Sequence, residues 1–270
     1  MLHLANYQER VGGGWSFLSN FKKGLEKLGN APGSYEEADT YFIAGCTMVT
    51  HDEVDKAKAD GKRIVLRIDN AVRNSRNRGT GMTRMKAFAE KADLIIYQSE
   101  WAKGYLKPFI EKDGAVVLNG IDTSIFNTYG RARNRQYVYI RSSRDETKNW
   151  EMARYWFSRK WQTDQEIQLN IVGKFSSENL QYNFDFYQGE KFYFLGEQPP
   201  VTIADILRSS TSFLYSYYND ACSNTLIEAL ACGCRIIDVE GMLQTGGSPE
   251  IMDLQDLSLE RMTKEYLRVL

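Results

Sequence analysis

The chain has 270 residues, 43% of them hydrophobic and 26% charged, with a formal net charge of −1. This length favours two modest domains over one large domain, and the composition is ordinary for a globular protein. The sequence contains no run of about 18 apolar residues, the length needed to span a membrane. Residues 1–6 lack the basic and apolar regions of a signal peptide.

The first half alternates short apolar runs with segments of helical periodicity. Gly12, Gly13 and Gly14 precede residues 15–28, whose apolar residues recur at helical spacing up to Gly29. The expected strands are residues 40–44, 63–67, 94–97 and 115–118, and the expected helices between them lie near 52–60, 83–92 and 100–110.

The second half repeats this rhythm. Its expected strands are residues 137–140, 166–172, 192–195, 212–215 and 235–238. Such alternation predicts an α/β protein of two doubly wound domains. Polar residues 126–136 suggest the boundary, so we expect domains at 1–126 and 127–256 and an amphipathic helix at 257–270.

The four cysteines (Cys46, Cys222, Cys232 and Cys234) show no metal-ligand spacing. Free thiols in a reducing compartment are the simplest interpretation, which predicts a cytoplasmic protein.

Residues 220–233 are the most informative stretch of the sequence. Their pattern predicts a loop that becomes a helix, with unpaired amide groups at Asn224, Thr225 and Leu226. The positive end of a helix dipole binds anions readily. Asp220 and Glu228 flank this start, so we expect a ligand with both phosphate and sugar hydroxyl groups. An ordinary loop and amphipathic helix would show a similar pattern.

This stretch resembles the signature of retaining glycosyltransferases with the GT-B fold, of the family 4 type. There an acidic residue, seven other positions and a glutamate precede Ala-Leu-Ala-x-Gly. The resemblance implies that Glu228 holds the ribose of a nucleotide-sugar and that Asp220 contacts the transferred sugar. The chain departs from the common form by Asp at position 220 and by Cys-Ser where Gly-Phe-Gly is usual.

The resemblance also implies the architecture. Two Rossmann-like domains would face a central cleft, the first binding the acceptor and the second the nucleotide-sugar. The C-terminal helix would pack back onto the first domain. Residues 92–101 and the turn at 119–122 resemble further segments of the family.

Further residues are expected at the donor through the same resemblance. Gly13 and Gly14 resemble the loop that approaches the donor phosphates. Lys148, with Arg141 or Arg144, would neutralise the diphosphate as it leaves, Arg144 being the preferred partner. Gly173 and Gly196 end two expected strands and complete the nucleotide contacts. A flexible turn and a solvated basic loop are the alternatives.

The sequence has no Asp-x-Asp motif, which the metal-dependent alternative fold of glycosyltransferases carries. We therefore expect no metal and no cofactor, because arginine, lysine and a helix N-terminus can handle the diphosphate charge. The expected donor is a UDP-sugar.

Residues 67–86 carry five arginines and one lysine against a single aspartate. Arginine interleaved with polar residues suits phosphodiester recognition, so the expected acceptor contacts are Arg73, Arg76, Arg78 and Arg84. Asp69 would orient or deprotonate the acceptor hydroxyl, or simply cap the following turn.

This segment resembles stretches in glycosyltransferase-like proteins of tailed phages, some of which modify hydroxymethylated bases of DNA. The preferred acceptor is therefore double-stranded DNA with hydroxymethylated bases, in the host cytoplasm for a phage protein. A phosphorylated lipid or surface glycan fits the charge equally well.

Two other classes compete with a glycosyltransferase. A non-catalytic nucleic-acid-binding protein on the same fold would not need Arg144, Lys148 and Glu228 together. A sugar-nucleotide epimerase would not need the arginine-rich loop. A dinucleotide dehydrogenase is disfavoured because no Gly-x-Gly-x-x-Gly follows a strand.

Overall fold

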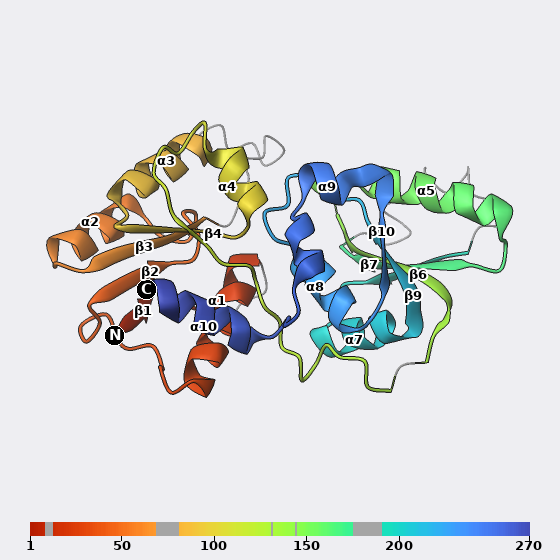
Figure 1. The fold of residues 1–270 in the computed structure, drawn as a ribbon, viewed down its shortest axis with the longest axis horizontal. Coiled ribbons are helices and arrows are strands. Elements are labelled where there is room, and N and C mark those ends of the chain that lie inside the picture. Colours follow the sequence, from red (N-terminus) through yellow and green to blue (C-terminus); the bar gives the residue numbers. More distant parts are fainter. Residues whose placement is uncertain (9–12, 69–80, 131, 144, 175–190) are drawn as a thin grey trace. The chain divides into compact units, whose positions relative to one another are not determined.

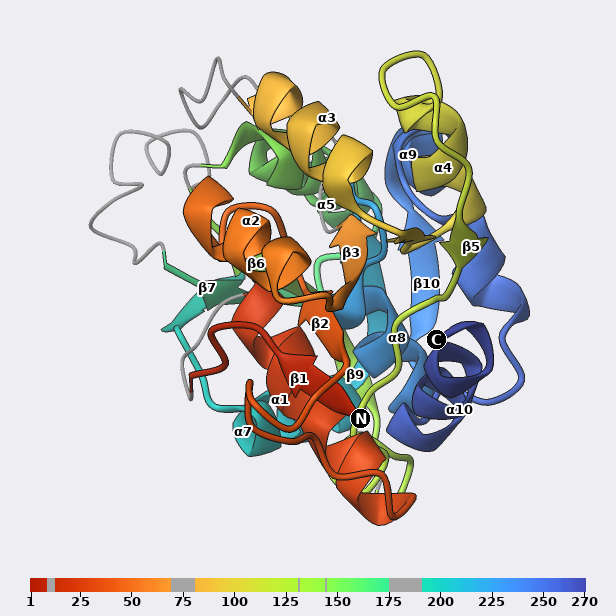
Figure 2. The same cartoon turned by 90° about the vertical axis from the view of Figure 1, so that its left-hand side faces the viewer.

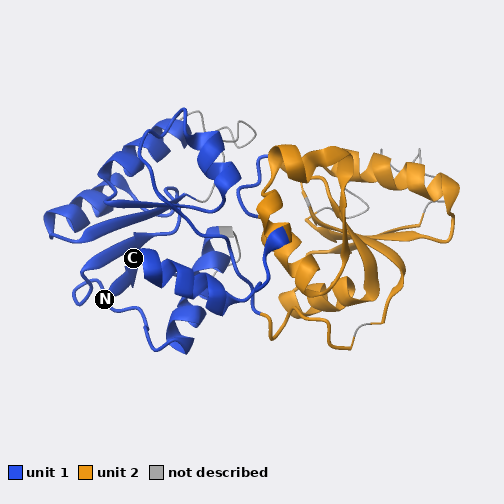
Figure 3. Cartoon of the chain, in the orientation of Figure 1, with its two compact units in different colours: residues 1–122, 219–222, 253–270 blue, residues 123–218, 223–252 orange. Residues whose placement is uncertain are grey.

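The computed structural model describes residues 1–8, 13–68, 81–130, 132–143, 145–174 and 191–270 (Figure 1). These residues form two compact units (Figure 3). Unit 1 consists of residues 1–122, 219–222 and 253–270, and unit 2 of residues 123–218 and 223–252. Each unit holds one parallel five-stranded sheet with flanking helices, which confirms the predicted α/β class with two domains.

The sheet of unit 1 has the strand order β1-β2-β3-β4-β5. Its strands are β1 (Leu2–Leu4), β2 (Thr40–Ile43), β3 (Arg63–Ile68), β4 (Leu94–Tyr97) and β5 (Ala115–Val116). Its helices are α1 (Gly13–Lys27), α2 (His51–Ala59), α3 (Gly81–Lys91), α4 (Glu100–Leu106) and α10 (Leu259–Val269).

Successive side chains of these strands point to opposite faces of the sheet, so they pack into two apolar cores, one on each face. Tyr41 and Leu66 face the core made with α2, α3 and α4, whereas Phe42 and Val65 face the core made with α1 and α10 (Figure 2). The C-terminal helix α10 is thus part of the core of unit 1.

Helix α1 lies on the opposite face from α2, although β1 to β2 and β2 to β3 step in the same direction across the sheet. Crossovers of one hand would put both helices on one face. The chain leaving α1 first passes outside β1, where the Gly33 amide donates to the Leu2 carbonyl at 2.9 Å. Helix α1 therefore connects β1 to the segment on the outer side of β1, in the direction away from β2. This reversed direction gives the connection the same handedness as the others, and the segment covers the outer edge of β1.

The sheet of unit 2 has the order β10-β9-β6-β7-β8. Its strands are β6 (Asn134–Ser142), β7 (Gln168–Gly173), β8 (Phe192–Gly196), β9 (Ser210–Tyr215) and β10 (Arg235–Asp238). Its helices are α5 (Trp150–Thr163), α7 (Pro200–Ser209), α8 (Asn224–Ala231) and α9 (Met242–Gly246), with short 3-10 turns at Glu146–Lys148, Val239–Gly241 and Pro249–Asp253.

Strand β6 is first in the chain and central in the sheet of unit 2. The chain moves from β6 to β7 and β8 on one side, and then returns to β9 on the other side. Such a reversal is a topological switch point, and ligands of open α/β sheets bind beyond the carboxyl ends of the strands there. Within the described residues, no helix combines the length and apolarity needed to cross a membrane.

Candidate functional site

The carboxyl end of β6 carries Arg141 on an unusual backbone. Its φ is 71°, in the left-handed region that costs a side-chain-bearing residue about 1–2 kcal/mol. The pairing of β6 with β7 also shifts register between Ile140 and Ser142. The Arg141 side chain is exposed, and its Nε donates to the Thr225 Oγ1 at 2.9 Å. Strain of this kind at a strand end is typical of a functional site.

Lys148 lies at the same switch point, on the short turn Glu146–Lys148. Asp145 caps this turn by accepting from the Thr147 amide at 3.1 Å. Only 8% of Lys148 is exposed, and its Nζ lies 4.5 Å from the centre of the Tyr217 ring. The ring face attracts the ammonium group and helps to fix its position. Arg144, the preferred partner of Lys148, lies outside the described residues.

Helix α8 begins beside Arg141, and its start differs from the expectation in one respect. Ser223 caps the helix, its Oγ accepting from the Leu226 amide at 3.3 Å. The prediction of an unpaired amide at Leu226 was therefore wrong, because a serine precedes the helix and satisfies that donor. Thr225 is buried and accepts from Arg141, so it ties the helix start to β6.

Glu228 follows one turn into α8 and is partly buried. Burial raises the pKa of Glu228 from 4.5 to about 7, and the positive charge of Arg141 offsets part of that rise. The structure thus brings Arg141, Thr225 and Glu228 together, as a cation, a hydroxyl and a titratable acid. This combination can bind a ligand that carries both phosphate and hydroxyl groups.

The glycines of the prediction fall into two groups. Gly196 ends β8 at a φ of 70° with open space where a side chain would start, and Gly173 ends β7. Gly13 and Gly14 are the first residues of α1, so they form a helix start and not a free loop. A Cβ at Gly14 would lie 2.6 Å from the Met48 Sδ, so this glycine allows close packing.

Asp220 belongs to unit 1, in the segment Asn219–Cys222, and is 9% exposed. The expected acceptor residues Asp69, Arg73, Arg76 and Arg78 lie outside the described residues. Arg84 is described, and its guanidinium donates to the carbonyls of Cys46, at 2.8 Å, and Val49. We therefore give Arg84 a structural role and leave it out of the acceptor contacts proposed below.

The carboxyl edge of the unit 1 sheet holds a polar network that the sequence did not suggest. Arg67 is 2% exposed and donates to the Ala44 carbonyl, to Gln98 Oε1 and to Asn119 Oδ1, at 3.1, 2.6 and 3.1 Å. Its Cζ also lies 3.7 Å from the centre of the Phe17 ring. Within the described part of the chain, no carboxylate pairs with Arg67, so neutral oxygens accept the bonds that its two terminal nitrogens donate.

Two supporting residues of unit 2 were also missed. Tyr217 lies beneath Lys148, and Ser223 caps α8. A signal existed for Ser223, because a serine directly before an amphipathic run is a common helix start. No such signal marks Tyr217, whose position depends on how the chain turns after β9.

No family model and no curated protein sequence matches this chain. Solved structures do resemble it. AviGT4, a glycosyltransferase involved in avilamycin A biosynthesis, has a TM-score of 0.67 at 13% identity, over 99% of this chain and 96% of that chain. WaaG, a glycosyltransferase involved in lipopolysaccharide biosynthesis, has a TM-score of 0.59 at 11% identity, over 100% of this chain and 90% of that chain.

Other similar structures are longer. Sucrose-phosphate synthase from Thermosynechococcus elongatus has a TM-score of 0.58 at 16% identity over 82% of this chain, which spans 58% of that protein. The chain spans 51% of S. aureus TarM and 50% of the pneumococcal O-GlcNAc transferase GtfA, and both of those structures contain UDP. A putative UDP-N-acetylglucosamine 2-epimerase from Listeria monocytogenes also matches, with a TM-score of 0.51 at 14% identity over 96% of this chain and 71% of that chain. At these identities the likeness shows the fold alone, which is the GT-B architecture of two α/β domains, each with a parallel sheet.

Proposed function

We propose that this protein is a glycosyltransferase that uses a nucleoside-diphosphate sugar, with UDP as the preferred nucleotide. The observation that carries the proposal is the group at the switch point of unit 2. Arg141 stands on a strained backbone, reaches the start of α8 and lies near Glu228. The GT-B fold and its glycosyltransferase neighbours support the same function.

In the proposed reaction, the bond between the anomeric carbon and the diphosphate breaks, and its electron pair leaves with the diphosphate. Arg141 or Arg144 and Lys148 stabilise the charge that develops there, since cations aimed at developing charge lower the barrier. The oxocarbenium-like sugar then accepts the oxygen of an acceptor hydroxyl, whose proton passes to the leaving diphosphate or to Asp69. Retention of the anomeric configuration is proposed from the family resemblance of residues 220–233.

The roles of the two acids follow the same proposal. Glu228 binds the ribose hydroxyl groups, and Asp220 contacts the transferred sugar. Gly173 and Gly196 let the backbone approach the nucleotide, and the first amides of α8, at Asn224 and Thr225, face the diphosphate.

We propose hydroxymethylated DNA as the acceptor, because Arg73, Arg76 and Arg78 follow a strand end of unit 1 and suit phosphodiester contacts. Mass spectrometry of reactions with pooled nucleotide-sugars and hydroxymethylcytosine DNA tests both substrates. Binding to DNA should weaken steeply with salt. Changing the three arginines to alanine should reduce that salt slope by up to ~3 units, at ~0.9 per phosphate contact. An unchanged slope would favour a glycan or lipid acceptor.

We also propose that the reaction needs no metal ion, since Arg141 and Lys148 supply positive charge that can neutralise the diphosphate in its place. Activity should survive a saturating chelator. Complete loss of activity that added metal restores would contradict this part of the proposal.

A sugar-nucleotide epimerase is the second candidate, because the Listeria protein shares the fold. The two functions differ in what happens without an acceptor. A transferase releases nucleoside diphosphate slowly by hydrolysis of the donor, whereas an epimerase converts UDP-N-acetylglucosamine into an isomer. Proton NMR of the protein with UDP-N-acetylglucosamine alone distinguishes these outcomes.

A further inference from the structure

The segment Asn219–Cys222 lies in the chain between two elements of unit 2, β9 and α8, yet it belongs to unit 1. Asn219 has a φ of 53°, a left-handed conformation that asparagine tolerates better than most residues. The chain therefore leaves unit 2 for four residues and returns to it at Ser223. Asp220 is one of those four residues.

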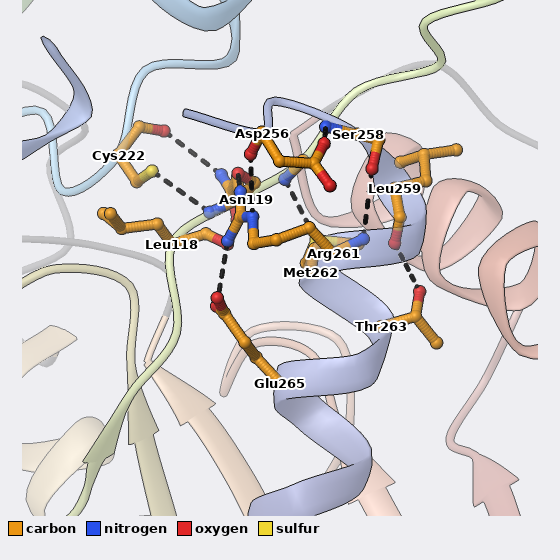
Figure 4. A network of polar contacts seen from close by, with 11 residues as sticks. Leu118, Asn119, Cys222, Asp256, Ser258, Leu259, Arg261, Met262, Thr263 and Glu265 are labelled. Carbon is orange, nitrogen blue, oxygen red and sulfur yellow. Dashed lines mark hydrogen bonds and ion pairs between the residues drawn. The ribbon is translucent and has the colours of Figure 1, made fainter. Parts of the chain in front are cut away.

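Two buried side chains of unit 1, Ser99 and Asn119, hold this segment, and Figure 4 shows the contacts between Asn119 and Cys222. Asn119 donates its backbone amide to the Cys222 Sγ at 3.4 Å and its Nδ2 to the Cys222 carbonyl at 3.2 Å. Ser99 donates its Oγ to the Ala221 carbonyl at 2.5 Å. Asn119 is 3% exposed and Ser99 is fully buried, so water competes little for these bonds.

Asn119 is itself fixed from two sides. Its Oδ1 accepts from Arg67 and its Nδ2 donates to Gln98, which join it to the ends of β3 and β4. From the other side, Arg261 of α10 donates to the carbonyls of Leu118 and Asn119, at 2.8 and 2.5 Å (Figure 4). The segment that carries Asp220 is therefore attached to a buried, hydrogen-bonded part of unit 1.

The Cys222 side chain is buried. Burial raises the pKa of the Cys222 thiol to about 12, so the sulfur stays neutral in ordinary buffers. A neutral sulfur can accept from the Asn119 amide without placing a second negative charge beside Asp220.

We infer that Ser99 and Asn119 are positioning residues, which set the place of the Asp220 carboxylate from unit 1. The nucleotide-binding groups Arg141, Lys148 and Glu228 all belong to unit 2. The inference rests on the proposed function, in which Asp220 contacts the transferred sugar. Asp220 is not one of these nucleotide-binding groups, so a change at Ser99 or Asn119 can impair reaction of the sugar without impairing nucleotide binding.

A matched pair of helix-cap variants tests this. Ser99 caps α4 by accepting from the Ala102 amide at 3.0 Å, and Thr50 caps α2 by accepting from the Glu53 amide at 3.2 Å. Both Ser99→Ala and Thr50→Ala lose a cap in unit 1, at about 1 kcal/mol each. Only Ser99→Ala also loses the bond to the Asp220 segment.

The assay measures hydrolysis of whichever of UDP-glucose, UDP-N-acetylglucosamine and GDP-mannose the wild-type protein hydrolyses fastest. The matching free diphosphate, UDP or GDP, is the binding probe in thermal melts. For Ser99→Ala we expect kcat to fall by ~10-fold or more, because small misplacement of a reacting group is costly. Its KM and its stabilisation by the diphosphate should stay at wild-type values. For Thr50→Ala, the kcat, the KM and the stabilisation by the diphosphate should all match the wild type.

Asn119→Asp is the second variant. It keeps an oxygen that accepts from Arg67 and loses the donor to the Cys222 carbonyl, so its kcat should fall in the same way. If Ser99→Ala and Asn119→Asp both hydrolyse the donor as fast as Thr50→Ala, the inference is overturned. Weaker diphosphate binding with an unchanged kcat would overturn it as well. If no diphosphate stabilises the wild-type protein and no donor is hydrolysed, the proposed function itself fails.

Discussion

The two sheets of this protein end in arginines that are used in opposite ways. In unit 1, Arg67 is buried at the carboxyl end of β3, and its guanidinium donates to three neutral oxygens. In unit 2, Arg141 is exposed at the carboxyl end of β6, on a left-handed backbone, and one bond to Thr225 orients it.

The difference between Arg67 and Arg141 shows how a ligand site can be recognised in a protein with two similar α/β units. An arginine whose N–H groups donate to oxygens at several strand ends stabilises the sheet, because moving its side chain would leave those buried oxygens without a donor. A charge that stays exposed on a strained backbone, near an acid of raised pKa, has contacts left for a ligand. By this criterion Arg67 stabilises unit 1, whereas Arg141 can still bind a ligand.

The largest effect that would test this comparison is expected at the unit 2 edge. Arg141→Ala and Lys148→Met should each slow sugar transfer by ~10²-fold or more, because each removes a charge-assisted contact that strengthens as the diphosphate leaves. Steady-state kinetics measures this, and thermal melts with UDP should show less stabilisation. Arg144→Ala, measured beside Arg141→Ala, decides which arginine partners Lys148.

The control for these variants is Arg135→Ala, at the opposite end of the same strand. Arg135 forms an exposed ion pair with Asp164, and such pairs contribute little. Transfer by Arg135→Ala should match the wild type. If Arg141→Ala and Lys148→Met also match it, the diphosphate is not bound at this edge.

The next effect concerns stability at the unit 1 edge. Arg67→Met should destabilise unit 1 by about 2 kcal/mol, since buried acceptors left without a donor cost about 1 kcal/mol or more each. Hydrogen exchange followed by mass spectrometry measures this unit by unit. Peptides of β3 and β4 should exchange faster, and peptides of β6 and β9 should not change.

Arg63→Met is the matched change, because Arg63 begins the same strand and is exposed. It should leave the exchange of both units nearly unchanged. Equal effects of Arg63→Met and Arg67→Met would show that the Arg67 network contributes no special stability.

Much of the fold could be predicted from the sequence, because buried parallel strands are continuous apolar runs that alternate with helical periodicity. The strands at 94–97 and 235–238 have the predicted bounds. The assignment of residues 219–222 to unit 1 could not be predicted. It depends on side-chain hydrogen bonds between residues as far apart as Ser99 and Ala221, which leave no local pattern.

The candidate site was predictable in part. The approach of Arg141 to α8 follows from the strand order, since both lie at the switch point. The charge of residues 67–86 does not tell the roles of its arginines apart. Five arginines look alike in sequence, but Arg67 and Arg84 donate to oxygens inside unit 1. Counting charges does not separate arginines that bind the protein itself from those that bind a partner.

A smaller effect should appear in the pH dependence of unit 2. The pKa of Glu228 is about 7 in the folded protein and 4.5 for a free side chain, so the folded state binds the extra proton between these values. The contribution of Glu228 to the free energy of unfolding should therefore fall as pH rises from about 4.5 to about 7, and then level off. Glu228→Gln removes this contribution.

Thermal melts of the wild type and Glu228→Gln at pH 5 and pH 8 measure the effect. The variant should gain melting temperature relative to the wild type between pH 5 and pH 8. A difference that is the same at both pH values would contradict the raised pKa. In the Arg141→Ala background the effect should extend to higher pH, because the positive charge that favours ionised Glu228 is gone.

The smallest effect compares one glycine in each unit. Gly61 and Gly196 have φ angles of 78° and 70°, and each has open space where a side chain would start. Alanine at either position should therefore cost only the strain of the left-handed backbone, about 1 kcal/mol. Gly61 lies between α2 and β3, whereas Gly196 ends β8 on the edge that we assign to the nucleotide. Gly61→Ala and Gly196→Ala should lower the melting temperature similarly, but only Gly196→Ala should weaken the stabilisation by UDP. Equal stabilisation by UDP in both variants would mean that the backbone at the end of β8 does not contact the nucleotide.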